Sequence, residues 1–320
     1  MKVLSRRDGY VQDPTRYFNF ERFAKKCGDF VLIEAGFEKE TMWEHYDLRG
    51  KELKNILKKK IVRLEFEEPN KFFIGDNPDE YDSQFYKIFT LCPYTADWLN
   101  AKNKNKKRIP IYFVYNEEFI PPKAEKKYDI IYTGHIVSKT LLNDLKTMSK
   151  FNYRFVSNSK HELVTNMSAP YDEKMRLITQ SKITLVHNLL YPNFYHILNV
   201  WRLSGYRNNG AFKLIPPIYK PWELLTNKNI VVPQLKSRVF EAAFGRSLIL
   251  CKRDPFNVIE RYFEPDKEFI YYDDTNLESK ITEILKNFSK YEKVIDNAYN
   301  KAVDNYTVTK FVDTYLKNLK

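Results

Sequence analysis

Short apolar runs alternate with amphipathic stretches over the second half of the chain. Buried strands are predicted at residues 128–133, 153–157, 183–190, 247–251 and 269–272. Apolar positions recur at helical spacing between them, for example at residues 172–180, 257–263 and 277–287. Strands that alternate with helices pair in parallel through right-handed crossovers, so this half predicts a doubly wound α/β sheet.

The first half has a more mixed pattern. Its predicted strands lie at residues 31–35, 61–66, 87–92 and 109–114, with helices at 51–60 and 95–102. Residues 120–127 contain two prolines and no apolar period, which is typical of a linker. Residues 290–319 fit two consecutive helices. We therefore predict a first domain at 1–125, a second at 126–288, and C-terminal helices at 289–320 that pack back toward the first domain.

Composition is consistent with two globular domains. The 320 residues are 43% hydrophobic, which is enough for two sizeable cores. Three scattered cysteines predict neither a disulfide framework nor a zinc site, so reduced thiols and a cytoplasmic location are expected. The start of the chain does not resemble a signal peptide, and no apolar run approaches the roughly 18 residues that span a bilayer.

A net charge of +12 raises the possibility of binding to nucleic acid or to an anionic membrane surface. The one dense basic run is 102–108, between two apolar segments, and most other lysines lie beside acidic residues. We interpret that run as a solvated loop and expect no nucleic-acid partner. Peripheral contact with a membrane surface remains an open alternative.

A short helix is predicted to begin near Lys236 and to end at Gly245, before a buried strand. Arg238 and Glu241 are three residues apart on this helix and share a face. Backbone N–H groups at a helix start, with Lys236, Arg238 and the hydroxyl of Ser237, suit a diphosphate, and Glu241 suits ribose hydroxyls. The alternative is an Arg238–Glu241 pair on an ordinary surface helix.

Other candidate side chains lie at the ends of predicted strands, where parallel sheets bind ligands. Gly134 and His135 follow the first strand of the second half, and His187 and Asn188 belong to the third. Each could contact a bound ligand. The alternative is that His135 is a loop residue and His187 a hydrogen-bonded core histidine.

A carboxylate that could serve as a base is harder to find. Glu67 and Glu68 follow the predicted strand 61–66 and would face a cleft between the domains. We assign Glu68 and His187 as the candidate catalytic residues. The alternative for Glu68 is a solvated surface carboxylate.

Four segments occur in a fixed order after residue 128: Tyr128-Asp-Ile-Ile-Tyr-Thr-Gly134, Ser181-Lys-Ile-Thr-Leu-Val-His-Asn188, Ser237-Arg-Val-Phe-Glu-Ala242 and Tyr262-Phe-Glu-Pro-Asp-Lys-Glu268. Together they resemble the donor domain of GT-B glycosyltransferases of the glycosyl transferases group 1 family, in the spore-maturation glycosyltransferase-like branch. The resemblance covers a little over half of the chain. It implies a GT-B architecture, in which two Rossmann-like domains face a central cleft.

The resemblance also implies a function. Such an enzyme moves a sugar from a nucleoside-diphosphate sugar, held on the second domain, to a saccharide, lipid-linked or protein acceptor. Glu241 matches the family's ribose-binding glutamate, and Arg238 with Lys236 matches its pyrophosphate-facing cations. Many members carry another acidic residue eight positions before that glutamate, near the sugar, where this chain has Pro233.

No obligatory metal or cofactor is expected. Departure of a nucleoside diphosphate requires positive charge, which fixed cations supply here. A metal-dependent enzyme would use an Asp-x-Asp motif, and the nearest candidates, Asp273-Asp274 and Asp76 with Asp79, lack that spacing. Two alternatives remain: a fucosyltransferase-like GT-B enzyme, suggested by Phe263-Glu-Pro-Asp-Lys267 and Asp273-Asp274, and a noncatalytic basic protein that binds nucleic acid or an acidic partner.

Overall fold

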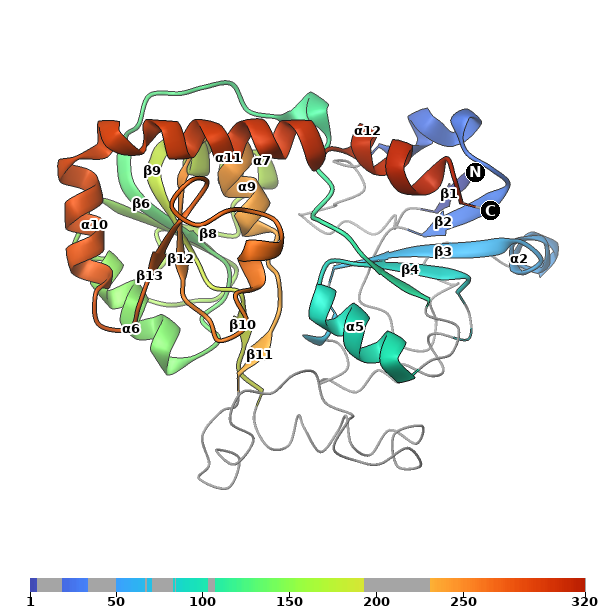
Figure 1. Cartoon of the computed structure of the whole chain (residues 1–320), viewed down its shortest axis with the longest axis horizontal. Helices are drawn as coiled ribbons and strands as arrows, with labels where there is room; N and C mark the ends of the chain where they lie inside the picture. Colours follow the sequence, from blue (N-terminus) through green and yellow to red (C-terminus); the bar gives the residue numbers. More distant parts are fainter. Residues whose placement is uncertain are drawn as a thin grey trace. The chain divides into compact units, whose positions relative to one another are not determined.

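The chain folds into two compact units, each with its own sheet (Figure 1). The computed structural model describes residues 1–4, 19–33, 50–66, 68–70, 83, 85–102, 107–192 and 231–319, without the side chains of Trp98 and Lys102. Unit 1 consists of Met1–Val114, Leu189–Leu235 and Val308–Lys320. Unit 2 consists of Tyr115–Asn188 and Lys236–Thr307.

This division differs from the boundary predicted after residue 125. The backbone N–H of Tyr115 donates to the carbonyl of Tyr306 at 3.2 Å. Lys126 donates its ammonium group to the carbonyls of Thr179 and Arg246, at 2.7 and 2.6 Å. The segment with the two prolines is therefore held within unit 2 by backbone acceptors, which a composition pattern does not show.

The chain also leaves unit 2 between Asn188 and Lys236, inside the stretch predicted to be one domain. Leu189 and Leu190 form strand β10, which pairs antiparallel with β11, Val232–Pro233. The predicted insertion at 191–229 lies almost wholly outside the described residues. At the end of the chain, residues 308–320 belong to unit 1.

Unit 1 contains a five-stranded parallel sheet whose strands stand side by side in chain order. The strands are β1 (Lys2–Leu4), β2 (Phe30–Ile33), β3 (Lys60–Glu65), β4 (Lys87–Thr90) and β5 (Arg108–Pro110). β2 is buried at every position, as expected for a parallel sheet that is covered on both faces. The four strands predicted in this region are confirmed, although β5 is shorter than predicted.

Helical segments accompany this sheet. They are η1 (Phe20–Lys26), α2 (Gly50–Leu57), α5 (Pro93–Lys102), α12 (Val308–Phe311) and the π-helical turn η9 (Val312–Leu316). The ring of Phe311 packs edge-on against Phe89 and Phe20, with centroids 5.1 and 5.7 Å apart. The C-terminal residues thus bury an aromatic side chain in unit 1.

Unit 2 contains a six-stranded parallel sheet in the order β13-β12-β9-β6-β7-β8. The strands are β6 (Tyr128–Thr133), β7 (Tyr153–Ser157), β8 (Asn166–Met167), β9 (Ser181–Val186), β12 (Leu248–Lys252) and β13 (Ile270–Tyr272). The first strand of this sheet in sequence order, β6, lies in the interior of the sheet. The next two strands, β7 and β8, are added on one side of it, and β9, β12 and β13 are added on the other side. This is the predicted doubly wound sheet.

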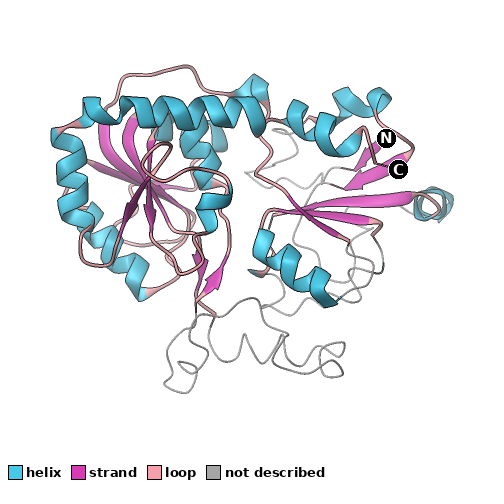
Figure 2. Cartoon of the chain, in the orientation of Figure 1, coloured by secondary structure: helices cyan, strands magenta, loops and turns pink. Residues whose placement is uncertain are grey.

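Helices flank the unit 2 sheet on both faces (Figure 2). The α-helices are α6 (Lys139–Met148), α7 (Tyr171–Thr179), α9 (Arg238–Phe244), α10 (Leu277–Lys286) and α11 (Glu292–Asn305). α6 begins after Ser138, whose hydroxyl accepts from the N–H of Leu141 at 3.1 Å. Leu141, Leu145 and Met148 then face the strands. The helix predicted at 257–263 is only a 3₁₀ turn, η7 (Val258–Arg261).

Candidate functional site

The switch in strand order in unit 2 lies between β6 and β9, which are neighbours in the sheet. The chain continues from β6 toward one side of the sheet and from β9 toward the other. Crossovers therefore diverge at the carboxyl ends of these two strands, which is where doubly wound sheets bind ligands. Gly134 and His135 follow β6, and His187 and Asn188 follow β9.

Gly134 and Arg238 are in close contact at this edge. Gly134 has a φ of +128°, and a Cβ added there would overlap Nη2 of Arg238 and lie 3.1 Å from its Cζ. The guanidinium group also lies over the ring of Tyr132, with Cζ 4.6 Å from the centroid. Only glycine satisfies both the backbone angle and the close approach of the cation.

Arg238 is half-buried, and no carboxylate among the described residues pairs with it. Burial removes part of the water that would solvate a cation, so a stacked guanidinium without an ionic partner favours the binding of an anion. The planar group has donors in a fork that matches phosphate oxygens.

Asn188 fixes the start of α9 beside the end of β9. Its Oδ1 accepts from the backbone N–H of Lys236 at 3.1 Å, and its Nδ2 lies 3.6 Å from Sγ of Cys251. Ser237 precedes α9 with helical backbone angles, and its hydroxyl makes no capping bond. α9 has only seven residues, so the side chain of Arg238 contributes more to the local charge than the helix end does.

Glu241 is buried in α9 and binds α7. Its Oε1 accepts from the hydroxyl of Tyr171 at 3.0 Å and from the ammonium group of Lys174 at 2.8 Å. Its side chain is 2% exposed. The alternative of a surface pair between Arg238 and Glu241 is therefore wrong.

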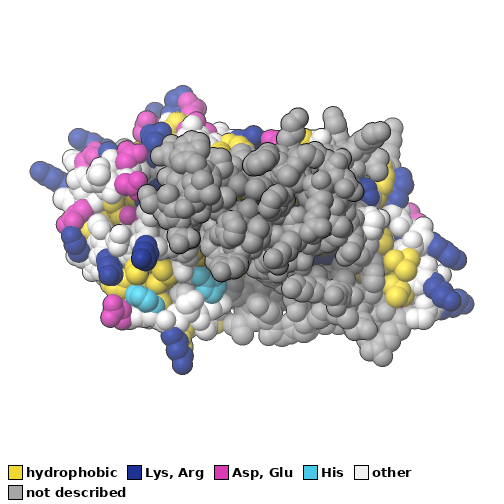
Figure 3. All heavy atoms as spheres, turned by 90° about the horizontal axis from the view of Figure 1, so that it is seen from below, with side chains coloured by type: hydrophobic (Ala, Val, Ile, Leu, Met, Phe, Trp, Pro, Cys, Tyr) yellow, Lys and Arg dark blue, Asp and Glu magenta, His cyan; other side chains and the backbone are white. Residues whose placement is uncertain are grey.

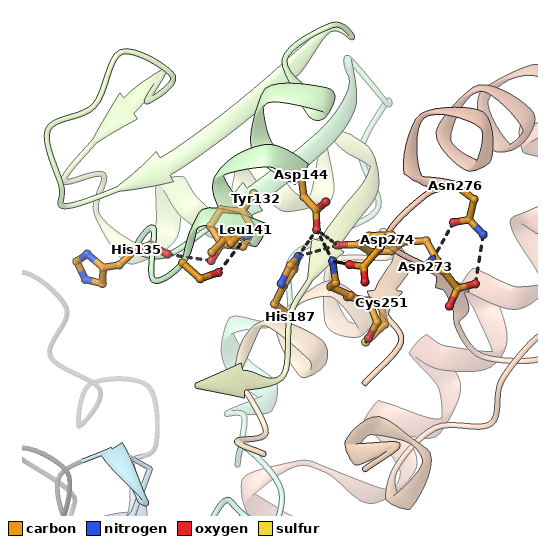
Figure 4. Close-up of polar contacts among 12 residues, drawn as sticks. Tyr132, His135, Leu141, Asp144, His187, Cys251, Asp273, Asp274 and Asn276 are labelled. Carbon is orange, nitrogen blue, oxygen red and sulfur yellow. Dashed lines mark hydrogen bonds and ion pairs between the residues drawn. The ribbon is translucent and has the colours of Figure 1, made fainter. Parts of the chain in front are cut away.

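His187 belongs to a buried polar cluster at the carboxyl edge (Figure 4). Its Nε2 lies 2.6 Å from the hydroxyl of Tyr272 and 3.0 Å from Oδ2 of Asp144, which comes from α6. Lys252, the last residue of β12, lies 3.2 Å from the same Asp144 oxygen and 2.5 Å from Oδ1 of Asp274. Strands β9, β12 and β13 and helix α6 thus meet at one carboxylate.

Burial and charge set the protonation of this cluster. Burial lowers the pKa of His187, although Asp144 acts in the opposite direction. Burial alone would raise the pKa of Asp144, but its hydrogen bonds and charge interactions with His187 and Lys252 outweigh burial and lower it. At neutral pH the pair is therefore a neutral imidazole beside a carboxylate.

His135 lies apart from this cluster. Its side chain is exposed, with Nδ1 2.8 Å from Oγ of Ser159, and its carbonyl accepts from the hydroxyl of Tyr132 at 3.1 Å. In Figure 4 its ring points away from His187. The structure thus places His135 in the loop after β6, as the alternative interpretation holds.

Glu68 lies in unit 1 and is fully buried. Its carboxylate accepts from Arg108, with Nη2 2.9 Å from Oε1 and Nε 3.1 Å from each oxygen. Its carbonyl accepts from Nε2 of Gln234 at 3.2 Å. This is a buried ion pair and not the solvated carboxylate of the alternative interpretation. Glu67 lies outside the described residues.

The sequence prediction did not include five residues that complete the site, namely Tyr171, Lys174, Asp144, Lys252 and Tyr272. One signal was available for Asp144, because it shares a helical face with Leu141, Leu145 and Met148 and so places a charge on an apolar stripe. Tyr171 and Lys174 contact Glu241, Tyr272 contacts His187, and Lys252 contacts Asp144, in each case from an element far away in the sequence.

Several properties concern the described surface as a whole. On the larger described part of the face drawn in Figure 3, basic and acidic side chains are interspersed. The described residues contain no group of three or more His, Cys, Asp or Glu side chains placed to hold a metal ion. No described helix is both long enough and apolar enough to cross a bilayer.

The sequence and the fold are similar to those of known proteins. A family model described as glycosyl transferase-like matches residues 137–317, more than half of the chain. The structure is similar to HepE from Anabaena in complex with UDP and glucose, with a TM-score of 0.57 and 8% identity over 100% of this chain and 99% of that one. No curated protein sequence matched.

A second similar structure is a TarM variant from S. aureus in complex with fondaparinux, alpha-GlcNAc-glycerol and UDP. It has a TM-score of 0.53 and 8% identity over 93% of this chain. This chain spans 58% of the length of that TarM chain. At such identities the likeness concerns the fold, and it confirms the predicted α/β fold of GT-B type.

Proposed function

The chain belongs to the glycosyl transferase-like family, and on that premise we propose that it transfers a sugar from a nucleoside-diphosphate sugar to a saccharide, lipid-linked or protein acceptor. The bond between the anomeric carbon and the diphosphate breaks, and the diphosphate leaves with the electron pair. An acceptor hydroxyl oxygen bonds to the same carbon, and its proton passes to the departing diphosphate or to water. Negative charge therefore develops on the leaving diphosphate.

One observation carries the proposal: the guanidinium group of Arg238 lies over Gly134 at the switch point and has no carboxylate partner among the described residues. A diphosphate there would receive forked N–H donors where charge develops. Lys236 and Ser237, directly before Arg238, would complete the contact. We propose that His187 and Asn188 border the same space and that His135 lies at its outer rim.

Glu241 would bind the ribose. Both of its described partners, Tyr171 and Lys174, bond to the same oxygen, Oε1. The second oxygen, Oε2, has no bonding partner among the described side chains, and a ribose hydroxyl could donate to it. The contact with Lys174 also holds the carboxylate in place, and a hydrogen bond to a carboxylate is stronger than one between neutral groups.

The remaining parts of the proposal concern the acceptor and the metal requirement. Because Arg238 supplies positive charge directly, we propose transfer that needs no metal ion or other cofactor. The four sequence segments support the spore-maturation glycosyltransferase-like branch. A cytoplasmic location, a lipid-linked acceptor and peripheral contact with a membrane surface stay predictions. We propose that Glu68 holds Arg108 in unit 1 and does not act as a base.

A thermal-shift panel tests the function. UDP-, GDP-, ADP- and CMP-sugars are added separately, in EDTA and again with Mg²⁺. A ligand that binds only the native state increases the free energy of unfolding, by about 2.7 kcal/mol at a ligand concentration one hundred times its Kd, and so raises the melting temperature. We expect one nucleotide class to give a clear rise with or without the metal.

Two variants make the panel specific. Arg238→Ala should abolish most of the rise, whereas Arg176→Ala, which removes an exposed arginine paired with Glu173, should leave it intact. If none of the nucleotide sugars stabilises the wild-type protein, the proposed function is wrong.

A further inference from the structure

His187 uses only one of its two ring nitrogens within the protein. Nε2 contacts both Asp144 and Tyr272. Nδ1 is buried and has no hydrogen-bond partner among the groups that the structure describes. A buried acceptor or donor without a partner is destabilising, so such an atom beside a candidate site requires an explanation.

The contacts of Asp144 determine which ring nitrogen carries the proton. An ionised carboxylate can only accept hydrogen bonds. Its Oδ2 receives the hydroxyl of Tyr272 at 3.0 Å and the ammonium group of Lys252 at 3.2 Å. Nε2 of His187 lies 3.0 Å from the same oxygen and must also be a donor. In a neutral imidazole the other nitrogen, Nδ1, then has a lone pair and accepts.

We propose that Asp144, Tyr272 and Lys252 position His187 as the tautomer protonated on Nε2, and that its Nδ1 accepts a hydrogen bond from a hydroxyl group of the sugar nucleotide. This inference rests on the proposed function. A phosphate oxygen at neutral pH has no proton to donate and therefore cannot be the partner of Nδ1. His187 thus recognises a hydroxyl, and Arg238 recognises the diphosphate.

The burial of His187 limits how a ligand hydroxyl can reach it. The residue is 2% exposed, so a hydroxyl reaches Nδ1 only when neighbouring side chains shift. The hydrogen bond formed then recovers the free energy that the unpaired acceptor costs. A ligand without the hydroxyl would leave the acceptor unpaired and would bind more weakly.

The first test is spectroscopic and needs no ligand. Protein labelled with ¹⁵N-histidine shows, in long-range ¹H–¹⁵N correlation spectra, which nitrogen of each imidazole is protonated. We expect His187 to carry its proton on Nε2 in the wild type. Asp144→Asn offers an amide N–H to Nε2 and should move the proton to Nδ1, whereas the matched variant Asp129→Asn, at a half-exposed pair with Lys182, should not. A wild-type protein with the proton on Nδ1 would overturn the proposal.

The second test locates the hydroxyl by calorimetry with UDP, 2′-deoxy-UDP, 3′-deoxy-UDP and UDP-glucose. His187→Leu removes the acceptor, and His187→Asn retains an oxygen near the place of Nδ1. If a ribose hydroxyl is bound, His187→Leu weakens UDP and UDP-glucose about tenfold and spares one of the deoxy compounds. If a sugar hydroxyl is bound, only UDP-glucose is weakened. His187→Asn should restore part of the affinity in either case.

The outcomes separate this inference from the function itself. A wild-type protein that binds no nucleotide sugar in the wider panel contradicts the proposed function. Suppose instead that the wild-type protein binds nucleotide sugars. If His187→Leu then binds all four uridine compounds with unchanged affinity, or with an equal loss of affinity for all four, only the proposed role of His187 is contradicted. Tyr272→Phe provides a milder variant that keeps Asp144, and it should leave the tautomer unchanged.

Discussion

The two sheets of this protein differ in how their strands are ordered and in how their charges are compensated. Unit 1 adds its described strands in one direction, from β1 to β5, and pairs Glu68 with Arg108 and Arg63 with Glu65 in its interior. Unit 2 reverses direction at β6. At that edge Arg238 has no carboxylate partner, and Nδ1 of His187 has no hydrogen-bond partner, among the described residues. A reversal separates the crossovers and provides room for a ligand.

A charged residue near the end of a parallel strand is therefore not by itself a functional residue. Both Glu68 and Arg238 are predicted as site residues from their positions in the sequence. Glu68 is fully occupied by a bidentate partner, whereas Arg238 is stacked on Tyr132 and held over a glycine. The presence of an internal partner distinguishes them, and that property depends on the fold.

The largest effect is expected from Glu68→Gln in unit 1. It removes one charge of the buried Glu68–Arg108 pair and should lower the free energy of unfolding by about 3–5 kcal/mol. Urea denaturation followed by fluorescence measures this change. Glu278→Gln, at an exposed pair with Lys150, is the control and should change stability by less than about 1 kcal/mol. A stable Glu68→Gln protein that lacks activity would make Glu68 a catalytic base and would remove the contrast between the units.

Arg238→Ala should have the next largest effect. It should weaken the interaction with the donor nucleotide sugar and leave the fold intact. Loss of charge-assisted hydrogen bonds of about 1.5–3 kcal/mol lowers kcat/KM roughly tenfold to a hundredfold. Steady-state kinetics with the nucleotide sugar from the panel measures it. Arg238→Lys keeps the charge without the fork and should recover only part of the loss. Unchanged kinetics in Arg238→Ala would place the diphosphate elsewhere.

Gly134→Ala should affect both stability and activity. A non-glycine residue at a φ of +128° is strained by about 1–3 kcal/mol, and the new methyl group displaces the guanidinium of Arg238. Thermal unfolding and donor affinity report the two consequences. The matched variant in unit 1 is Gly28→Ala, whose Cβ would have no described atom nearer than 3.8 Å. Equal effects of the two substitutions would show that the close approach of Arg238 has no importance.

Asp254 gives the smallest expected effect and depends on pH. This residue lies two positions after β12, and burial raises its pKa to about 6, against hydrogen bonds from the N–H groups of Phe256 and Val258. The folded state therefore binds more protons than the unfolded state between about pH 4 and pH 6. Stability from this group is present at the acidic end of that window and is lost as the pH rises through 6.

Asp254→Asn removes this titration. Between pH 4 and pH 7 the free energy of unfolding of the wild-type protein should fall by about 1–2 kcal/mol relative to that of the variant. Each unit of pKa shift contributes at most about 1.4 kcal/mol, and the expected change lies somewhat below that limit for the whole shift. Urea denaturation across this pH range measures the difference. Parallel pH profiles of the two proteins would show that the carboxyl edge of unit 2 holds Asp254 without an electrostatic penalty.

Much of the fold of unit 2 could be predicted from sequence, because the alternation of short strands and amphipathic helices is local. The helix that begins at Arg238 and the strand that follows it were located to within about two residues. The order of strands could not be derived from the pattern alone, since alternation fixes parallel pairing and handedness but not the direction in which strands are added.

The site was predicted less completely, for a physical reason. Arg238 and Glu241 share a short helix, so their spacing indicated their common location. What each side chain contacts depends on residues far away in sequence: Tyr171 and Lys174 lie about 70 residues before Glu241, and Tyr272 lies 85 residues after His187. Burial and pairing of charges are tertiary properties, and single-sequence patterns contain little information on them.

The hydrogen bond from Lys236 to Asn188 has a consequence for the length of chain that unit 2 can accommodate between these two residues. It fastens together the two points at which the polypeptide departs from unit 2 and rejoins it. For a flexible loop whose ends are held together, each doubling of loop length adds only about 0.6 kcal/mol to the entropic cost of closing it. The connection between these two points can therefore vary in length at little entropic cost to the packing of unit 2.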